Sequence, residues 1–159
     1  AFTSEKFFSM QESFIGGAID FFKGKTSGKL TFQSSDFVGN ARFSDLDCNG
    51  KCELSLTNFK SDAYFTYANF GNDFRMANTT VWGKLDLISV QFQGNATLTN
   101  STFCHSVNLS KSTVNGQFDL SGTIFTLGKP VMEEFTTGPA GTIITKGTQF
   151  ATFKEFSEQ

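Results

Sequence analysis

The stretch from Gly28 to Thr126 divides, without insertion or deletion, into nine consecutive blocks of eleven residues. The blocks read GKLTFQSSDFV, GNARFSDLDCN, GKCELSLTNFK, SDAYFTYANFG, NDFRMANTTVW, GKLDLISVQFQ, GNATLTNSTFC, HSVNLSKSTVN and GQFDLSGTIFT. The third, fifth and tenth residues of every block are apolar, which makes 27 apolar sites (three in each of nine blocks) in a chain that is only 38% hydrophobic. Self-similarity at a fixed period is typical of repeat architectures.

An eleven-residue period also occurs in supercoiled helices, so the composition of the blocks has to decide. The blocks are rich in Gly, Asn, Ser, Thr and β-branched residues, which disfavour helix interiors. The third and fifth residues alternate with polar neighbours, and the eighth and tenth repeat that alternation, as in short strands with one buried face. Gly opens six of the nine blocks, which predicts a corner with positive φ at that position. The pattern therefore predicts a β-solenoid.

Strings such as Ala41-Arg42-Phe43-Ser44-Asp45 place a small residue two positions before a central Phe. In this the chain resembles the pentapeptide-repeat proteins. Its alternating five- and six-residue units resemble the Phe-rich branch of that superfamily, with G-x-A-x-F-x-x-S-x-F strings in eleven-residue double units. The resemblance covers residues 28–126, with a degenerate extension back to Lys6. It implies an all-β fold, a right-handed quadrilateral β-helix with two blocks, hence about 22 residues, in each coil.

Residues 22 positions apart should then stack in neighbouring coils of the solenoid. The predicted core ladders are, in one column, Phe43, Phe65, Leu87 and Leu109 and, in another, Phe37, Phe59, Phe103 and Phe125. The ends are less regular than the middle. We therefore divide the chain into 1–27, an N-terminal cap or degenerate repeats, 28–126, the regular solenoid, and 127–159, a C-terminal cap or assembly segment. Two further strand-like pieces are expected at 142–145 and 149–153.

The outward positions of the blocks carry a mixed surface. Glu53 and Arg75 should face each other on adjacent coils. Val38, Tyr64 and Trp82 form a candidate contact patch. The two aromatic residues of this patch also support one alternative function, a carbohydrate-binding solenoid.

The sequence offers little catalytic or metal-binding chemistry. Asp45, Asp47 and Asn49 copy the first half of a calcium loop, D-x-D-x-N-G, but the bidentate carboxylate expected at the twelfth position is replaced by Leu56. The single histidine, His105, has no second histidine or G-x-S-x-G string to accompany it, and no phosphate-cradling glycine motif is present. We therefore expect no enzyme activity, no metal and no cofactor.

Composition narrows the class of protein further. The chain has 159 residues, of which 18% are charged, and a net charge of −2, which argues against a nucleic-acid binder. No apolar run approaches the ~18 residues of a transmembrane segment. The sequence begins with Ala1 and contains four Asn-x-Ser/Thr sequons, at Asn78, Asn95, Asn100 and Asn108, which favours a processed protein that is secreted or held at the cell surface.

Ten of the 21 Phe lie outside the regular blocks, six before Gly28 and four after Thr126. The candidate end contacts are Phe2, Phe7, Phe135, Phe150, Phe153 and Phe156. A solenoid has two open edges, and head-to-tail contacts between such edges generate open polymers. The leading prediction is a non-enzymatic structural or interaction protein, an exported rigid scaffold whose partner is another copy of itself.

The family resemblance implies a second alternative. Some pentapeptide-repeat proteins mimic duplex DNA and bind DNA gyrase, a role that would place this chain in the cytoplasm. Those proteins carry strongly acidic faces, whereas 15 acidic residues are here scattered among 13 basic ones, so the expected field is weak.

Overall fold

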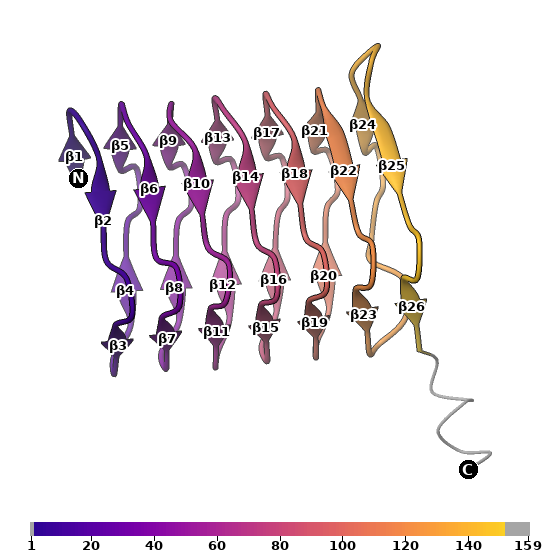
Figure 1. The fold of residues 1–159 in the computed structure, drawn as a ribbon, viewed down its shortest axis with the longest axis horizontal. Coiled ribbons are helices and arrows are strands. Elements are labelled where there is room, and N and C mark those ends of the chain that lie inside the picture. The colour runs from indigo at the N-terminus through magenta and orange to yellow at the C-terminus, as the bar shows by residue number, and fades with distance from the viewer. Residues whose placement is uncertain (1, 152–159) are drawn as a thin grey trace.

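The computed structural model describes residues 2–151, and all the regular secondary structure in them is β. The strands form four parallel sheets, which are the four sides of a solenoid whose coils stack along the long axis of the molecule (Figure 1). Through the regular blocks, paired residues lie 22 positions apart, as in Ala41 with Ala63 and Ala63 with Leu85. The predicted four-sided β-solenoid with about 22 residues per coil is thereby confirmed.

Each coil passes through the four sheets in the order A, B, C, D. Sheet A contains β1 (Thr3–Ser4), β5 (Lys25–Thr26), β9 (Asp47–Cys48), β13 (Asn69–Phe70), β17 (Gln91–Phe92), β21 (Thr113–Val114) and β24 (Thr136–Thr137). Sheet B contains β2 (Phe8–Ser9), β6 (Leu30–Thr31), β10 (Cys52–Glu53), β14 (Phe74–Arg75), β18 (Ala96–Thr97), β22 (Gln117–Asp119) and β25 (Thr142–Ile144). Sheet C contains β3 (Phe14–Ile15), β7 (Asp36–Phe37), β11 (Asn58–Phe59), β15 (Thr80–Val81), β19 (Thr102–Phe103), β23 (Ile124–Phe125) and β26 (Gln149–Phe150). Sheet D contains β4 (Ile19–Asp20), β8 (Ala41–Arg42), β12 (Ala63–Tyr64), β16 (Leu85–Asp86) and β20 (Val107–Asn108).

The core is built from the third, fifth and tenth residues of the blocks. All 27 of these side chains are at most 4% exposed, and so are all eight residues of the two predicted core ladders. Because parallel coils repeat at about 4.8 Å, equivalent rings stack nearly face to face. The ring centroids of Phe37 and Phe59 are 4.9 Å apart at an interplanar angle of 4°, and those of Phe43 and Phe65 are 4.9 Å apart at 10°.

Positive φ occurs at the seventh residue of each block, and the prediction that placed it at the first residue is wrong. Tyr67, for example, has φ 61°. It is the third residue of a four-residue turn in which the N–H of Ala68 donates to the carbonyl of Phe65 at 2.9 Å. Glycine at the first position has a different cause. A Cβ on Gly83 would lie 2.5 Å from the carbonyl carbon of Ser61 in the preceding coil, so the close stacking of coils favours glycine at residue 83.

The two turn corners of a coil bury different side chains at the eighth position of the block. On the corner between sheets D and A, three successive coils carry Leu46, Ala68 and Val90, all buried, and the next coil carries Ser112, whose buried hydroxyl donates to the carbonyl of Leu87. On the corner between sheets B and C, every coil carries a hydroxyl: Ser13, Ser35, Thr57, Thr79, Ser101, Thr123 and Thr148. We call this column the hydroxyl corner.

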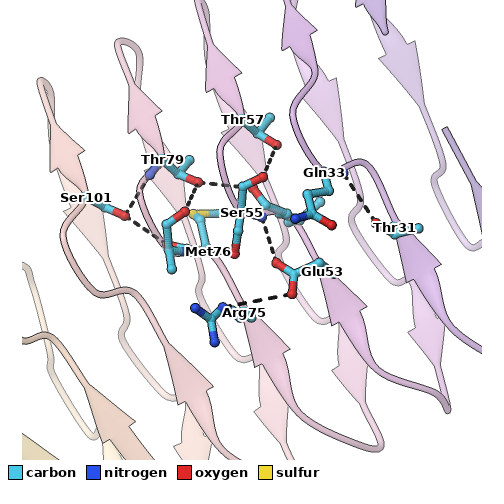
Figure 2. A network of polar contacts seen from close by, with 11 residues as sticks. Thr31, Gln33, Glu53, Ser55, Thr57, Arg75, Met76, Thr79 and Ser101 are labelled. Carbon is cyan, nitrogen blue, oxygen red and sulfur yellow. Dashed lines mark hydrogen bonds and ion pairs between the residues drawn. The ribbon is translucent and has the colours of Figure 1, made fainter. Parts of the chain in front are cut away.

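The hydroxyl corner fastens each coil to the one before it. Thr79 Oγ1 donates to the carbonyl oxygen of Leu54 at 3.0 Å, and Ser101 Oγ donates to that of Met76 at 2.9 Å while accepting the N–H of Thr79 at 3.1 Å (Figure 2). Buried backbone groups are costly unless they are hydrogen-bonded. The hydroxyls therefore satisfy groups that the turns leave open, and among residues 2–151 no buried side-chain nitrogen or oxygen lacks a partner.

Both end segments continue the coil. At the N-terminal end, β1 to β4 pair with β5 to β8 at the same spacing of 22 residues. At the C-terminal end the spacing grows to 23 where Thr113 pairs with Thr136, and to 25 where Phe125 pairs with Phe150. The extra residues lie in loops, one of them around Pro139, between β24 and β25. Strands β25 and β26 fall within the two stretches predicted to be strand-like.

Candidate functional site

Exposed apolar side chains gather at both ends of the solenoid, where Phe7, Phe14, Leu127, Val131 and Ile143 lie. In the middle coils the inward columns are closed, whereas at each end they stop at side chains that the next coil would have covered. The partly buried apolar residues packed on the core are Phe2, Phe8, Met10, Ile15 and Ile19 at the N-terminal end, and Met132, Phe135 and Phe150 at the C-terminal end. Both ends therefore present hydrocarbon to solvent.

At the N-terminal end, the predicted contacts Phe2 and Phe7 have different environments. Phe2 points into the core, edge-on to Phe8 and Phe21 at centroid distances of 4.9 and 5.1 Å. Phe7 points outward and is 66% exposed. Phe14, which the sequence pattern did not single out, is 73% exposed. A hollow of about 340 Å³ is lined by Phe7, Phe8, Ser9, Gln11, Lys29 and Thr31.

At the C-terminal end, the predicted contacts Phe135 and Phe150 extend the core. Phe150 stacks on Phe125 at 5.4 Å and 15°, and Phe135 lies 5.3 Å from Phe118. The predicted contacts Phe153 and Phe156 lie outside the described residues. A largely apolar hollow of about 280 Å³ is lined by Leu120, Lys129, Pro130, Met132, Ile143, Thr145 and Phe150.

Three exposed apolar residues of the C-terminal end were missed by the prediction from sequence. Leu127, Val131 and Ile143 are 62%, 45% and 46% exposed. Ile143 pairs with Phe118, whose side chain is wholly buried, so Ile143 occupies a core column with no coil above it. Extending the column from Phe118 past the insertions, with the spacing allowed to grow, would have found it.

The proposed side patch spans one corner and the adjoining sheet. Trp82 is 54% exposed and follows β15, whereas Val38 follows β7 two coils earlier, about 10 Å away along the axis. Tyr64 lies on the outer face of sheet D, where its hydroxyl donates to Asp62 Oδ2 at 2.8 Å. That bond raises the pKa of Tyr64. Two other exposed side chains, those of Leu56 and Tyr67, lie at turn positions and were not predicted.

Charged groups on the sides form small, separate sets. Arg42 lies 3.5 Å from Asp20 and stacks on the ring of Phe22 at 3.8 Å, on sheet D. Glu53 and Arg75 approach to 3.9 Å on sheet B (Figure 2). Exposed pairs of this kind contribute at most about 1 kcal/mol each. Each of these two pairs joins opposite charges, so neither adds net charge to the surface.

Asp62, on the sides of the solenoid, is a carboxyl group whose pKa is lowered by a hydrogen bond between coils. The backbone N–H of Lys84 in the following coil donates to Asp62 Oδ1 at 2.7 Å, and this bond lowers the pKa of the carboxyl group. Asn40 has the same role in the preceding coil, where it accepts the N–H of Asp62 at 3.2 Å. At this position of the coil, the side chain accepts a backbone N–H of the following coil, and either an amide or a carboxylate oxygen can do so.

Asp45 and Asp47, two residues of the calcium-loop lookalike, have structural roles in the solenoid. Asp45 lies in the left-handed turn position at φ 55°, and Asp47 Oδ1 accepts a hydrogen bond from Asn69 at 3.0 Å. Asn49 is exposed at the next corner. Within residues 2–151 no three His, Cys, Asp or Glu side chains are grouped so that they could hold a metal ion.

The three cysteines are free thiols, two of them in contact inside the core. A hydrogen bond from the Cys52 thiol lowers the pKa of Cys48, while burial raises the pKa of Cys52. Burial also raises the pKa of Cys104, which is only partly exposed. The neighbour of His105, Ser106, donates its N–H to His105 Nδ1 at 2.7 Å.

No family model, no curated protein and no solved structure matches this chain. The resemblance to pentapeptide-repeat proteins stays a prediction made from the residues. What the structure defines is the class: a β-solenoid repeat protein. Residues 2–151 include no helix of the length and hydropathy needed to cross a bilayer.

Proposed function

We propose that this chain is a non-enzymatic structural solenoid that binds further copies of itself through its two ends. The observation that carries the proposal is the exposure of the core columns at both ends. Ile143 is 46% exposed, whereas its column neighbour Phe118 is fully buried. A partner that caps these columns buries hydrocarbon, which contributes roughly 25 cal/mol for each Å² removed from water.

The backbone at the ends supports the same proposal. An edge strand presents unpaired N–H and C=O groups, which are a template for pairing with another chain. The outermost strands are β1 to β4 at one end and β24 to β26 at the other. The strands at these edges contain no Lys and no Pro, although Lys129 and Pro130 lie beside them in the hollow at the C-terminal end. The edge strands themselves therefore lack two common devices that block edge pairing.

The surface of the sides supports a scaffold rather than an enzyme. It carries small ion pairs and hydrogen-bonded Asn, Asp and Thr ladders, as between Asn58 Nδ2 and Asp36 Oδ1 at 2.9 Å. The net charge of −2 gives little repulsion between copies. Such a rod supplies stiffness and length.

We further propose that the scaffold acts outside the cell or at its surface. The support is the position of two sequons: Asn78 and Asn100 are exposed and lie in successive coils on the same corner. Fractionation of the producing cells tests this proposal. Recovery in the medium or in the surface fraction would support it, and recovery in the cytosol would contradict it.

Sedimentation velocity over a range of protein concentrations, followed by electron microscopy, tests the self-association. We expect rods that lengthen in steps of one monomer, about 34 Å for seven coils at about 4.8 Å each. Ile143→Asp should abolish the association because it places a charge on the exposed core column. Leu56→Asp is the matched control, since Leu56 is 52% exposed on the side of the rod. A wild-type protein that stays monomeric, or equal effects of the two variants, would refute the proposal.

A further inference from the structure

The two ends of the solenoid match each other in direction. Sheets A, B and C each contain seven strands, so each of them has a first strand at the N-terminal end and a last strand at the C-terminal end of the same side (Figure 1). All pairings between strands are parallel, for example β1 with β5 and β23 with β26. A second copy shifted along the axis without rotation would therefore set β1 on β24, β2 on β25 and β3 on β26, all parallel.

The backbone donors and acceptors match as well. In sheets A and C, each strand donates its N–H groups to the preceding coil, as from Lys25 to the carbonyl of Phe2 at 2.8 Å and from Gln149 to that of Thr123 at 2.8 Å. In sheet B the direction is reversed, as from Leu120 to the carbonyl of Ile144 at 2.8 Å. At the N-terminal edge, β1 and β3 thus direct N–H groups outward and β2 directs carbonyls. At the C-terminal edge, β24 and β26 direct carbonyls outward and β25 directs N–H groups. In the shifted arrangement every donor faces an acceptor.

The side-chain columns also continue across such a junction. The register places Phe8 above Ile143, because both belong to the column that contains Leu30 and Phe118. Ile15 falls above Phe150 in the column of Phe37 and Phe125. Apolar groups thus meet apolar groups, and the hollow lined by Ile143 and Phe150 receives the inward side chains of the next copy.

The polar columns continue too. Ser13 falls above Thr148, so the hydroxyl corner runs from one copy into the next. Thr3 falls above Thr136, and Thr136 Oγ1 already lies 2.9 Å from Oγ1 of Thr113, the equivalent neighbour within one chain. The pairing of threonine with threonine between coils is therefore repeated at the junction.

From this match we infer that the C-terminal end of the solenoid binds the N-terminal end of a second copy by pure translation, with 3 above 136, 8 above 143 and 15 above 150. The inference rests on the proposed self-association and adds its geometry. The resulting filament has no twist beyond that of the coils, and its three continuous sheets pass through every junction.

Cysteine cross-linking tests the register. In a Cys104→Ser background, which leaves only the buried thiols of Cys48 and Cys52, the pair Thr3→Cys and Thr136→Cys places two outward sulfurs on adjacent parallel strands. Their Cα atoms would be about 4.8 Å apart, within the range that a disulfide spans. The matched control keeps Thr3→Cys but pairs it with Gln149→Cys, which lies at the same end on sheet C.

Mild oxidation with copper phenanthroline, followed by non-reducing electrophoresis, should give a ladder of covalent oligomers from the first pair and monomers from the control pair. A ladder from the control pair would mean that the second copy is rotated by half a coil. Dimers from Thr3→Cys alone would mean contact between two N-terminal ends. Either result would overturn the register while sedimentation still showed association. Absence of association by sedimentation in all variants and in the wild type would overturn the proposed function as well.

Discussion

Replacement of Thr79 by Val tests the hydroxyl corner with the smallest change of shape. The Thr79 side chain is 1% exposed, and its Oγ1 donates to the carbonyl oxygen of Leu54 in the preceding coil at 3.0 Å. Valine fills nearly the same volume but has no hydroxyl. The substitution therefore removes the donor and leaves the methyl packing in place.

Two opposing effects decide the sign of the change. Leaving the buried Leu54 carbonyl without this donor costs about 1–3 kcal/mol. Exchanging a buried hydroxyl for a methyl group returns about 0.8 kcal/mol, the value for one buried CH₂. We expect the loss to dominate, with a net fall of about 0.2–2 kcal/mol in the free energy of unfolding. If Thr79 made no hydrogen bond to Leu54 in the wild type, the added methyl group would make Thr79→Val more stable than the wild type.

Urea unfolding followed by circular dichroism measures the difference. With a slope of about 2 kcal/mol per M, the midpoint should fall by about 0.1–1 M. Thr97→Val is the control, because Thr97 lies on the outer face of β18 and its hydroxyl makes no hydrogen bond to another described residue. It should change stability by less than about 0.5 kcal/mol. A midpoint for Thr79→Val at or above that of the wild type would refute the role assigned to the hydroxyl corner.

Four further predictions concern unfolding midpoints. Phe65→Ala should cost about 3–5 kcal/mol because the ring is fully buried, while Tyr64→Ala on the outer face should cost about 1 kcal/mol or less, and similar midpoints would exclude the assigned register. Gly83→Ala should destabilise by more than about 1 kcal/mol, since its Cβ would strike the preceding coil; a neutral effect would contradict this contact. Tyr67→Gly should stabilise by up to about 1 kcal/mol, because Tyr67 has φ 61° and is 64% exposed; a loss would show that its side chain packs. The pKa of Asp62 is lowered in the folded protein, so the ionised carboxylate stabilises the fold at pH values above the usual carboxyl range. This stabilisation is lost as the pH falls through and below that range. In matched melts, Asp62→Asn should therefore lose less stability than the wild type between about pH 5 and pH 2.

The core could be predicted because burial acts on every block at the same phase. Phe43 and Phe65 are both buried fifth residues of their blocks. The spacing of 22 residues stacks them on each other regardless of the conformation of the corners. The same phase carried backward assigns Phe8 to the core and Phe7 to the outside. Strict periodicity therefore determines both the fold and the direction of most side chains.

The conformation of the corners could not be predicted from composition. The left-handed turn position tolerates Leu56, Tyr67 and Lys111 at a cost of only about 1–2 kcal/mol each, so evolution leaves little compositional trace there. Steric contact between coils is far less tolerant, and it concentrates glycine at the first position instead. Glycine enrichment thus reported a close approach of backbones rather than positive φ.

The candidate site at the two ends could be predicted from the sequence only in part. Exposure at an end depends on where the stacking stops, which no single block encodes. Phe150 could be assigned to an end from its position in the chain, but Ile143 became visible as an open core column only once the insertions around Pro139 had been placed. The hydroxyl corner was missed because its pattern appears only when alternate blocks are compared separately.

The difference between the two corners has a consequence for how this chain can change its length. Removal of a single block would carry every later residue half-way around the solenoid, so that the column of Thr79 would continue onto the corner that carries Leu46, Ala68 and Val90. Removal of two blocks restores every column. Duplication or deletion of whole coils therefore leaves both corners intact, and it changes the length of the molecule in steps of 22 residues, each about 4.8 Å long.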